Sequence, residues 1–219
     1  MTPVCQFVAN NSDDFWSDMV MEQNMNIKNM VKELFNGKDI RPEELPDIEL
    51  YMDQVTTFID NKLGFLKRSP ADKLLTKTMI NNYTKSKILL PSNNKKYDKD
   101  HMIVLILIYY LKQILSINDI HDLFLPLFKR ITAEKDSTTL TVIYSLFLDI
   151  KASDYDSFTS DLDSKLELIK SKTQNMKEND KEFAEKLLTV LILIFQAYSQ
   201  KRLAEKIIDE YFVIPRKTK

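Results

Sequence analysis

Apolar side chains recur every three to four residues along most of the chain, the spacing that puts them on one face of an α-helix. The sequence predicts helices over residues 13–36, 47–63, 75–86, 98–115, 136–151, 154–174 and 179–212, with a further helix starting after Ser116. Asp47, Asp98 and Ser116 are suited to cap helix N-termini, and Gly37 and Gly64 to end helices. Only residues 90–97 have turn and short-strand character. We therefore expect an all-α protein with at most one small hairpin.

The amino-acid composition narrows the class of protein that the chain can be. The 219 residues include 2 glycines, whereas a phosphate-binding loop or dinucleotide fingerprint needs several within a few positions. Cys5 is the single cysteine, so no internal disulfide is expected. The apolar runs 102–111 and 187–195 are about half the ~20 residues needed to cross a bilayer. We expect a cytoplasmic protein without a membrane segment.

The net charge of −1 hides an uneven distribution. Residues 1–60 carry 12 acidic and 4 basic groups, whereas residues 67–99 carry nine basic groups and two acidic ones, a balance of +7. A local positive field of this size attracts polyanions even when the whole molecule is neutral. The same segment is also compatible with a solvated lysine-rich surface. The asymmetry suggests nucleic acid as a partner.

The helix predicted at 75–86 has two faces. Met79, Ile80 and Tyr83 form an inward stripe, whereas Lys77, Asn81 and Lys85 recur at intervals of four on the other side, with Thr78 and Asn82 beside them. Asn bonds adenine through two hydrogen bonds, and Lys pairs with phosphate or guanine, so this face suits a major groove. An ordinary polar helix face is the alternative.

The order of the elements predicted from residue 75 to 124 resembles that of a known protein family. The short polar-faced helix leads to Ile88-Leu-Leu-Pro91, a brief basic turn ending in Tyr97, a capped helix, and then Ser116-Ile-Asn-Asp-Ile120. This order resembles the winged helix-turn-helix of MerR-type regulators. The resemblance implies framework positions at Ile80, Tyr83, Ile88, Leu89, Pro91, Tyr97, Met102, Leu111, Ser116 and Ile120.

A closer resemblance covers roughly residues 45–130. The stretches Asp47-Ile-Glu-Leu-Tyr-Met-Asp-Gln-Val55 and Leu75-Thr-Lys-Thr-Met-Ile-Asn-Asn-Tyr83 look like a bacterial family described as domain of unknown function 1836. That family implies a helical, MerR-like DNA-binding domain without an established target. The chain departs from the MerR pattern in three ways: Lys87 stands where Gly is usual, Asn81 and Asn82 replace Arg and Tyr, and the wing shortens to residues 92–96.

Catalytic and metal-binding patterns are missing from the sequence. His101 and His121 lack the spacing of a zinc site, and we expect His101 to face solvent or to take part in helix capping. The alternating Asp154, Asp156, Asp161 and Asp163 lack the glycine and terminal glutamate of a calcium loop and are expected at a helix N-terminus. We expect neither an enzyme nor a cofactor.

Three parts are expected: an acidic helical segment and linker at 1–44, the helix-turn-helix domain at 45–130, and a C-terminal helical domain at 131–219. The C-terminal helices either bury the apolar runs 102–111 and 187–195 within one protomer, form a homodimer surface, or enclose a small-molecule effector pocket. The fold class is thus an all-α, MerR-like winged helix-turn-helix with a short wing, followed by a helical bundle.

The leading interpretation is a transcriptional regulator that binds duplex DNA without chemistry; the alternative is a protein–protein interaction module. The residues expected to contact DNA are Lys73, Lys77, Thr78, Asn81, Asn82, Lys85, Lys95, Lys96 and Lys99. The acidic N-terminal part is a candidate shield of this face, and deletion of residues 1–40 is then expected to tighten DNA binding.

Overall fold

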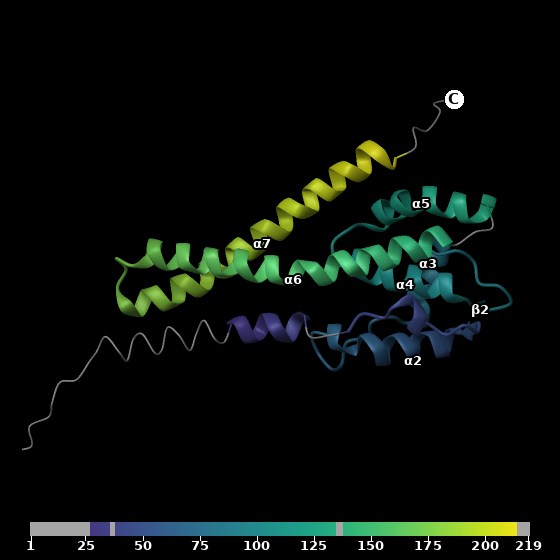
Figure 1. The fold of residues 1–219 in the computed structure, drawn as a ribbon, viewed down its shortest axis with the longest axis horizontal. Helices are drawn as coiled ribbons and strands as arrows, with labels where there is room; N and C mark the ends of the chain where they lie inside the picture. The colour runs from purple at the N-terminus through teal and green to yellow at the C-terminus, as the bar shows by residue number, and fades with distance from the viewer. Residues whose placement is uncertain (1–26, 36–37, 135–137, 214–219) are drawn as a thin grey trace, which may run out of the picture. The chain divides into compact units, whose positions relative to one another are not determined.

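The computed structural model describes residues 27–35, 38–134 and 138–213. The chain divides into two compact units, Met1–Gly37 and Lys38–Lys219. In the first unit residues 27–35 are helical, inside the predicted helix 13–36, whose remainder lies outside the described residues. The described part of the second unit is mostly helical and contains one two-stranded sheet, which confirms the mostly-α prediction (Figure 1).

The second unit opens with short elements. These are the 3-10 turn η1 (Pro42–Glu44), strand β1 (Leu50–Tyr51), helix α2 (Met52–Leu63) and the 3-10 turn η2 (Gly64–Leu66). The predicted helix start at Asp47 is wrong, because the backbone at 50–51 pairs as a strand first. Helix α2 instead begins after Tyr51, whose N–H donates to Gln54 Oε1 at 2.9 Å. Gly64 follows α2 as predicted, but with an ordinary helical φ of −55°.

The next elements are α3 (Lys77–Lys85) and β2 (Lys96–Tyr97). Strand β2 runs antiparallel to β1, with Leu50 opposite Tyr97 and Tyr51 opposite Lys96. Helix α2 contacts α3 as well as both strands. The short helix and the strand pair are therefore held against one common support.

Helix α4 (Lys99–Leu111) lies in the middle of the core. Its buried residues are His101, Met102, Ile103, Val104, Leu105, Ile106, Ile108 and Tyr109. Apolar side chains that point in every direction require cover on every side, and α4 contacts β2 and α6 within one continuous cluster. The prediction that run 102–111 is buried is confirmed, although α4 ends at Leu111 rather than at Leu115.

Helix α5 (Ile117–Glu134) starts at the predicted cap. Ser116 Oγ accepts from the N–H of Asp119 at 3.2 Å, and Asp119 Oδ2 accepts from the N–H of Ser116 at 3.0 Å. This reciprocal pair is a capping box, which satisfies two N–H groups at the helix start. Ile120 and Phe124 on α5 are buried in the core.

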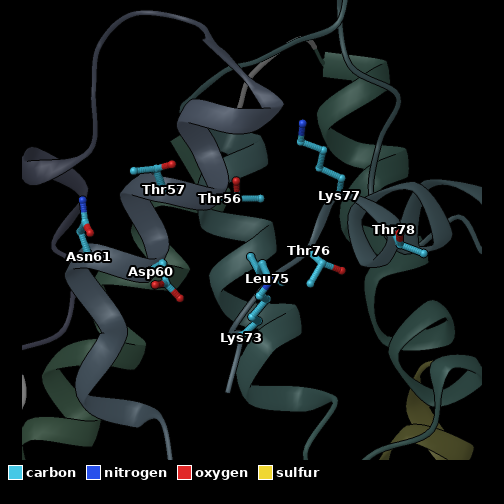
Figure 2. Close-up of a pocket in the computed structure, with 9 residues that line it drawn as sticks. All are labelled: Thr56, Thr57, Asp60, Asn61, Lys73, Leu75, Thr76, Lys77 and Thr78. Carbon is cyan, nitrogen blue, oxygen red and sulfur yellow. The ribbon is translucent and has the colours of Figure 1, made fainter. Parts of the chain in front are cut away.

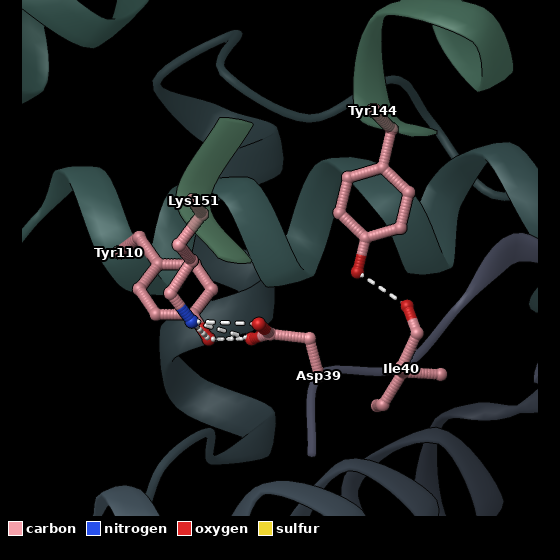
Figure 3. Close-up of polar contacts among 5 residues, drawn as sticks. All are labelled: Asp39, Ile40, Tyr110, Tyr144 and Lys151. Carbon is pink, nitrogen blue, oxygen red and sulfur yellow. Dashed lines mark hydrogen bonds and ion pairs between the residues drawn. The ribbon is translucent and has the colours of Figure 1, made fainter. Parts of the chain in front are cut away.

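A polar cluster joins the start of the second unit to two helices (Figure 3). Asp39 accepts hydrogen bonds from Tyr110 Oη at 2.7 Å and from Lys151 Nζ at 2.6 and 2.8 Å. One residue on, the carbonyl of Ile40 accepts from the buried Tyr144 Oη at 2.8 Å. Residues 39–40 thereby contact α4, 71 positions later in the chain, and α6, 104 and 112 positions later.

The last two helices, α6 (Thr138–Thr173) and α7 (Glu178–Tyr211), form a long antiparallel hairpin (Figure 1). Thr173 Oγ1 donates to Glu185 at 2.8 Å near its closed end. The two helices predicted at 136–151 and 154–174 are in fact the single helix α6. Asp154, Asp156, Asp161 and Asp163 consequently lie within this helix, so their expected place at a helix N-terminus is wrong.

Of the three arrangements considered for the C-terminal helices, burial of run 187–195 within one protomer is not what the described part of the chain shows. Most of its large apolar side chains are exposed, namely Leu187, Val190, Leu191, Ile192, Ile194 and Phe195. Helix α7 packs against α6 along one side and contacts α5, which leaves its other side uncovered. None of the described helices is long and apolar enough to span a bilayer.

Candidate nucleic-acid interface

Helix α3 separates a buried face from a polar exposed one, as predicted. Thr76 caps it, with Oγ1 accepting from the N–H of Met79 at 3.2 Å. Ile80 and Tyr83 are buried in the core and fix the orientation of the helix. All five predicted contact residues on the other face are exposed: Lys77, Thr78, Asn81, Asn82 and Lys85. The structure thus brings these side chains together on one accessible surface.

The end of α3 has a distinctive backbone. The N–H of Ile88 donates to Tyr83 O at 3.0 Å and that of Lys87 donates to Thr84 O at 3.1 Å. These two bonds form a Schellman motif, in which the residue after the C-cap takes a left-handed conformation. Lys87 occupies that position with a φ of 58°. Lys87 therefore takes the backbone role for which Gly is usual, and it places one more exposed cation at the end of α3.

The predicted short wing is a tight two-residue turn that leads into β2. Asn93 and Lys96 exchange two backbone hydrogen bonds, of 3.1 and 2.8 Å. Asn94 and Lys95 between them have φ values of 49° and 64°. Positive φ at both central positions defines a type I′ turn, whose twist matches that of paired strands. Lys95 is exposed at the tip, and Lys96 is half-buried with its Nζ 5.6 Å from the centre of the Tyr51 ring.

An open groove lies between α2 and the start of α3 (Figure 2). Its α2 side is formed by Thr56, Thr57, Asp60 and Asn61, and its other side by Lys73, Leu75, Thr76, Lys77 and Thr78. The exposed Lys73 thus lies beside the α3 N-terminus. Free N–H groups and the helix dipole make such a terminus favourable for anions. The Asp60 carboxylate in this groove is paired with Lys67, and the remaining hydroxyl, amide and ammonium groups around the helix start form a suitable setting for an anion.

Several lysines of this region are paired with carboxylates of residues 44–60. Lys77 forms an ion pair with Asp53, Lys99 lies 3.6 Å from Asp47, and Lys67 lies 2.7 Å from Asp60. The Lys77–Asp53 pair is mostly exposed, so it contributes little to stability and is open to competition from phosphate. The observed partners lie outside residues 1–40, and the proposed shielding by that segment stays a prediction.

His101 connects the turn after α3 to the start of α4. Its Nδ1 is 2.7 Å from Asp98 Oδ1, and its Nε2 is 3.3 Å from Pro91 O. Its ring packs edge-on against Tyr97, with the ring centres 5.5 Å apart. Burial alone would lower the pKa of His101, but the hydrogen bonds to Asp98 and Pro91 outweigh it and raise the pKa above its ordinary value. Of the two roles predicted for His101, helix capping is confirmed, because its backbone N–H donates to Oδ1 of the cap residue Asp98 at 3.0 Å. The solvent-facing role is wrong, because both ring nitrogens have acceptors inside the fold.

The framework positions implied by the MerR resemblance divide by burial. Seven are buried, namely Ile80, Tyr83, Ile88, Leu89, Tyr97, Met102 and Ile120. Leu111 is half-buried, Pro91 supplies the carbonyl that accepts from His101, and Ser116 caps α5. Sequence reasoning missed β1, the Asp39 cluster and the ring contacts of His101. The turn signal at 92–96 was the one local hint of strand pairing.

Residues 40–147 match the family model described as Domain of unknown function (DUF1836). We refer to these matched residues, just under half of the chain, as the DUF1836 domain. The match begins at Ile40 and ends shortly after Tyr144, the two residues joined by a hydrogen bond. The DUF1836 domain therefore includes α2 to α5 and the first turns of α6, and it is wider at both ends than the 45–130 resemblance. Comparison with curated proteins and with solved structures gave no match.

The rest of α6 and the whole of α7 lie outside the matched DUF1836 range. Among the described residues there is no group of three or more His, Cys, Asp or Glu side chains able to hold a metal ion. The feature of the DUF1836 domain with the clearest chemical use is the exposed Lys and Asn face of α3, with the lysine-bearing turn and the groove beside it.

Proposed function

We propose that the DUF1836 domain binds duplex DNA as a MerR-like winged helix-turn-helix and that the protein is a transcriptional regulator. The observation that carries this proposal is the exposed face of α3, where Lys77, Asn81 and Lys85 lie in one row opposite the buried Ile80 and Tyr83. A short, capped helix with such a face fits a major groove, and its Asn and Lys side chains are suited to base edges and phosphates.

The surroundings of α3 support the same proposal. Lys95 sits on the exposed tip of the type I′ turn, and Lys96 and Lys99 follow it along the chain. Lys73 and the N-terminus of α3 border the groove of Figure 2. We assign phosphate contacts to these four lysines and base contacts to α3. Residues 67–99 carry a balance of +7, which suits the electrostatic part of DNA affinity.

The test is binding of labelled duplex DNA by the full chain, followed by fluorescence anisotropy over a series of salt concentrations. Each phosphate contact releases counterions, so the affinity should fall steeply with salt. The triple change Lys77→Ala, Asn81→Ala and Lys85→Ala should weaken binding roughly tenfold or more and flatten the salt dependence, because it removes two cations and one base-reading amide.

A matched control removes the same residue types elsewhere. Lys172, Asn175 and Lys177 are exposed around the α6–α7 connection, and their joint change to Ala should leave DNA affinity nearly unchanged. Circular dichroism of both variants checks that helical content is retained. If the native protein shows no affinity for duplex DNA at low salt, the proposal fails and the protein–protein interaction module remains.

A further inference from the structure

Helix α7, which lies outside the DUF1836 domain, carries a long uncovered apolar surface. Seven large apolar side chains on this helix are between 45% and 69% exposed: Phe183, Leu187, Val190, Leu191, Ile194, Phe195 and Tyr198. Their steps of three and four residues place them on one face, over a length of about 22 Å. This stripe points away from α6, to which α7 is bound by Glu185 and Gln196.

The size of the stripe is unusual for a surface that stays in water. A fully buried aromatic side chain removes 150–250 Å² from solvent, so seven half-exposed apolar residues offer roughly 500–700 Å². Soluble monomers rarely expose a continuous apolar patch of that extent. A standard interface between two proteins buries about 800 Å² on each partner, so a protein surface of similar size would cover it.

The charges that flank the stripe indicate which protein surface would cover it. Residues 178–186 carry four acidic and two basic groups, whereas residues 201–206 carry three basic groups and one acidic group. No charged residue occurs from 187 to 200. The apolar middle of α7 is therefore flanked by an acidic segment on one side and a basic segment on the other, and Asp209 and Glu210 follow the basic segment in the last turn. The two flanking segments are complementary to those of a second copy in reverse direction.

We propose that two copies of this chain dimerise through α7, with the two α7 helices antiparallel. A two-fold axis near residues 190–191 places Phe183 of one copy opposite Tyr198 of the other, and Asp180 opposite Lys201. Both copies then use the same patch, as a two-fold interface requires. A parallel pair would instead bring like charges together in the two segments that flank the apolar middle. This inference does not depend on DNA binding.

The first test is the mass of the full chain in solution, measured by sedimentation equilibrium over a concentration series. The native protein should reach a dimer mass. Changing Leu187 and Ile194 together to Glu should weaken dimerisation at least roughly tenfold, since buried charge without a partner is costly. Leu168→Glu on α6, another exposed leucine away from α7, is the control and should leave the mass unchanged. A native protein that is monomeric throughout overturns the proposal.

The second test fixes the orientation and leaves the apolar Leu187 and Ile194 unchanged. Asp180→Lys alone and Lys201→Glu alone should each weaken the dimer, and the combination should restore it, because the exchanged charges again face each other. In a background with Cys5→Ser, Phe183→Cys protein mixed with Tyr198→Cys protein should form a disulfide-linked dimer, whereas each alone should not. Linking of Phe183→Cys to itself would refute the antiparallel arrangement. A dimer affinity unchanged by the Leu187→Glu and Ile194→Glu changes of the first test would refute the α7 interface.

Discussion

The apolar runs in α4 and α7 look alike in sequence and differ in surroundings. Residues 102–111 and 187–195 are both free of charge and equally suited to a buried helix. Nearly all of the first run is buried, because the DUF1836 domain surrounds α4. The second run packs on α6 along one side and remains exposed along the other. An apolar run indicates that a helix must pack against other apolar surfaces. Whether those surfaces belong to the same chain depends on which elements surround the helix.

The largest expected effect is a difference in stability between substitutions in α4 and substitutions in α7. Ile106 on α4 is buried, so Ile106→Ala should lower the free energy of unfolding by roughly 3–4 kcal/mol, the cost of lost contacts and of a cavity. Ile194 on α7 is exposed, and Ile194→Ala should change the free energy of unfolding of the monomer by less than about 0.5 kcal/mol. Urea unfolding followed by circular dichroism at low protein concentration measures both. Equal losses would contradict the view that α7 is uncovered.

Local signals in the sequence predicted most of the helix starts inside the DUF1836 domain. The predicted caps Asp98 and Ser116 each cap a helix through a side-chain oxygen, a contact that spans three residues and is readable from the sequence alone. Thr76, which was not predicted as a cap, caps α3 in the same way. The two faces of α3 could be predicted for the same reason, because helical spacing fixes which residues share a side. Lys87 in the left-handed region also agrees with its place after a helix end.

Contacts between distant residues could not be predicted in this way. Strand β1 forms because Leu50 pairs with Tyr97. A strand of two residues is too short to show an alternating pattern in the sequence. The cluster of Asp39, Tyr110 and Lys151 depends on three separate parts of the chain. The continuity of α6 was missed because its aspartates resemble a new helix start, whereas the chain simply runs on through them.

A smaller effect is expected at the N-terminal end of α4, where His101 is buried beside Asp98. The pKa of His101 is raised above its ordinary value and that of Asp98 is lowered by the hydrogen bond from His101. The contribution of His101 to stability should therefore be complete below about pH 6.5 and lost as pH rises through the raised pKa. The contribution of Asp98 should be present above about pH 4 and lost as pH falls further.

Urea unfolding from about pH 4 to about pH 8.5 measures the part of this dependence that comes from His101. The native protein should become less stable on the alkaline side, and His101→Gln should remove that decline. His121, which lies 2.9 Å from Asp122 on α5, provides the control. The His121→Gln variant should become less stable on the alkaline side, as the native protein does. If the decline disappeared only in the His121→Gln variant, it would come from His121 and the prediction for His101 would be wrong.

The smallest expected effect concerns Lys87, where stability and the proposed function oppose each other. A non-glycine residue in the left-handed region is strained by about 1 kcal/mol, so Lys87→Gly should stabilise the protein by roughly 0.5–1 kcal/mol. Ser86→Gly, one position earlier at a φ of −80°, should instead lose a few tenths of a kcal/mol. If the exposed Lys87 contacts a phosphate, the more stable Lys87→Gly variant should bind DNA less tightly, with a salt dependence reduced by about one counterion. A gain in stability with unchanged DNA affinity would place Lys87 outside the interface and restrict the DNA-binding face to α3 and the lysine-bearing turn.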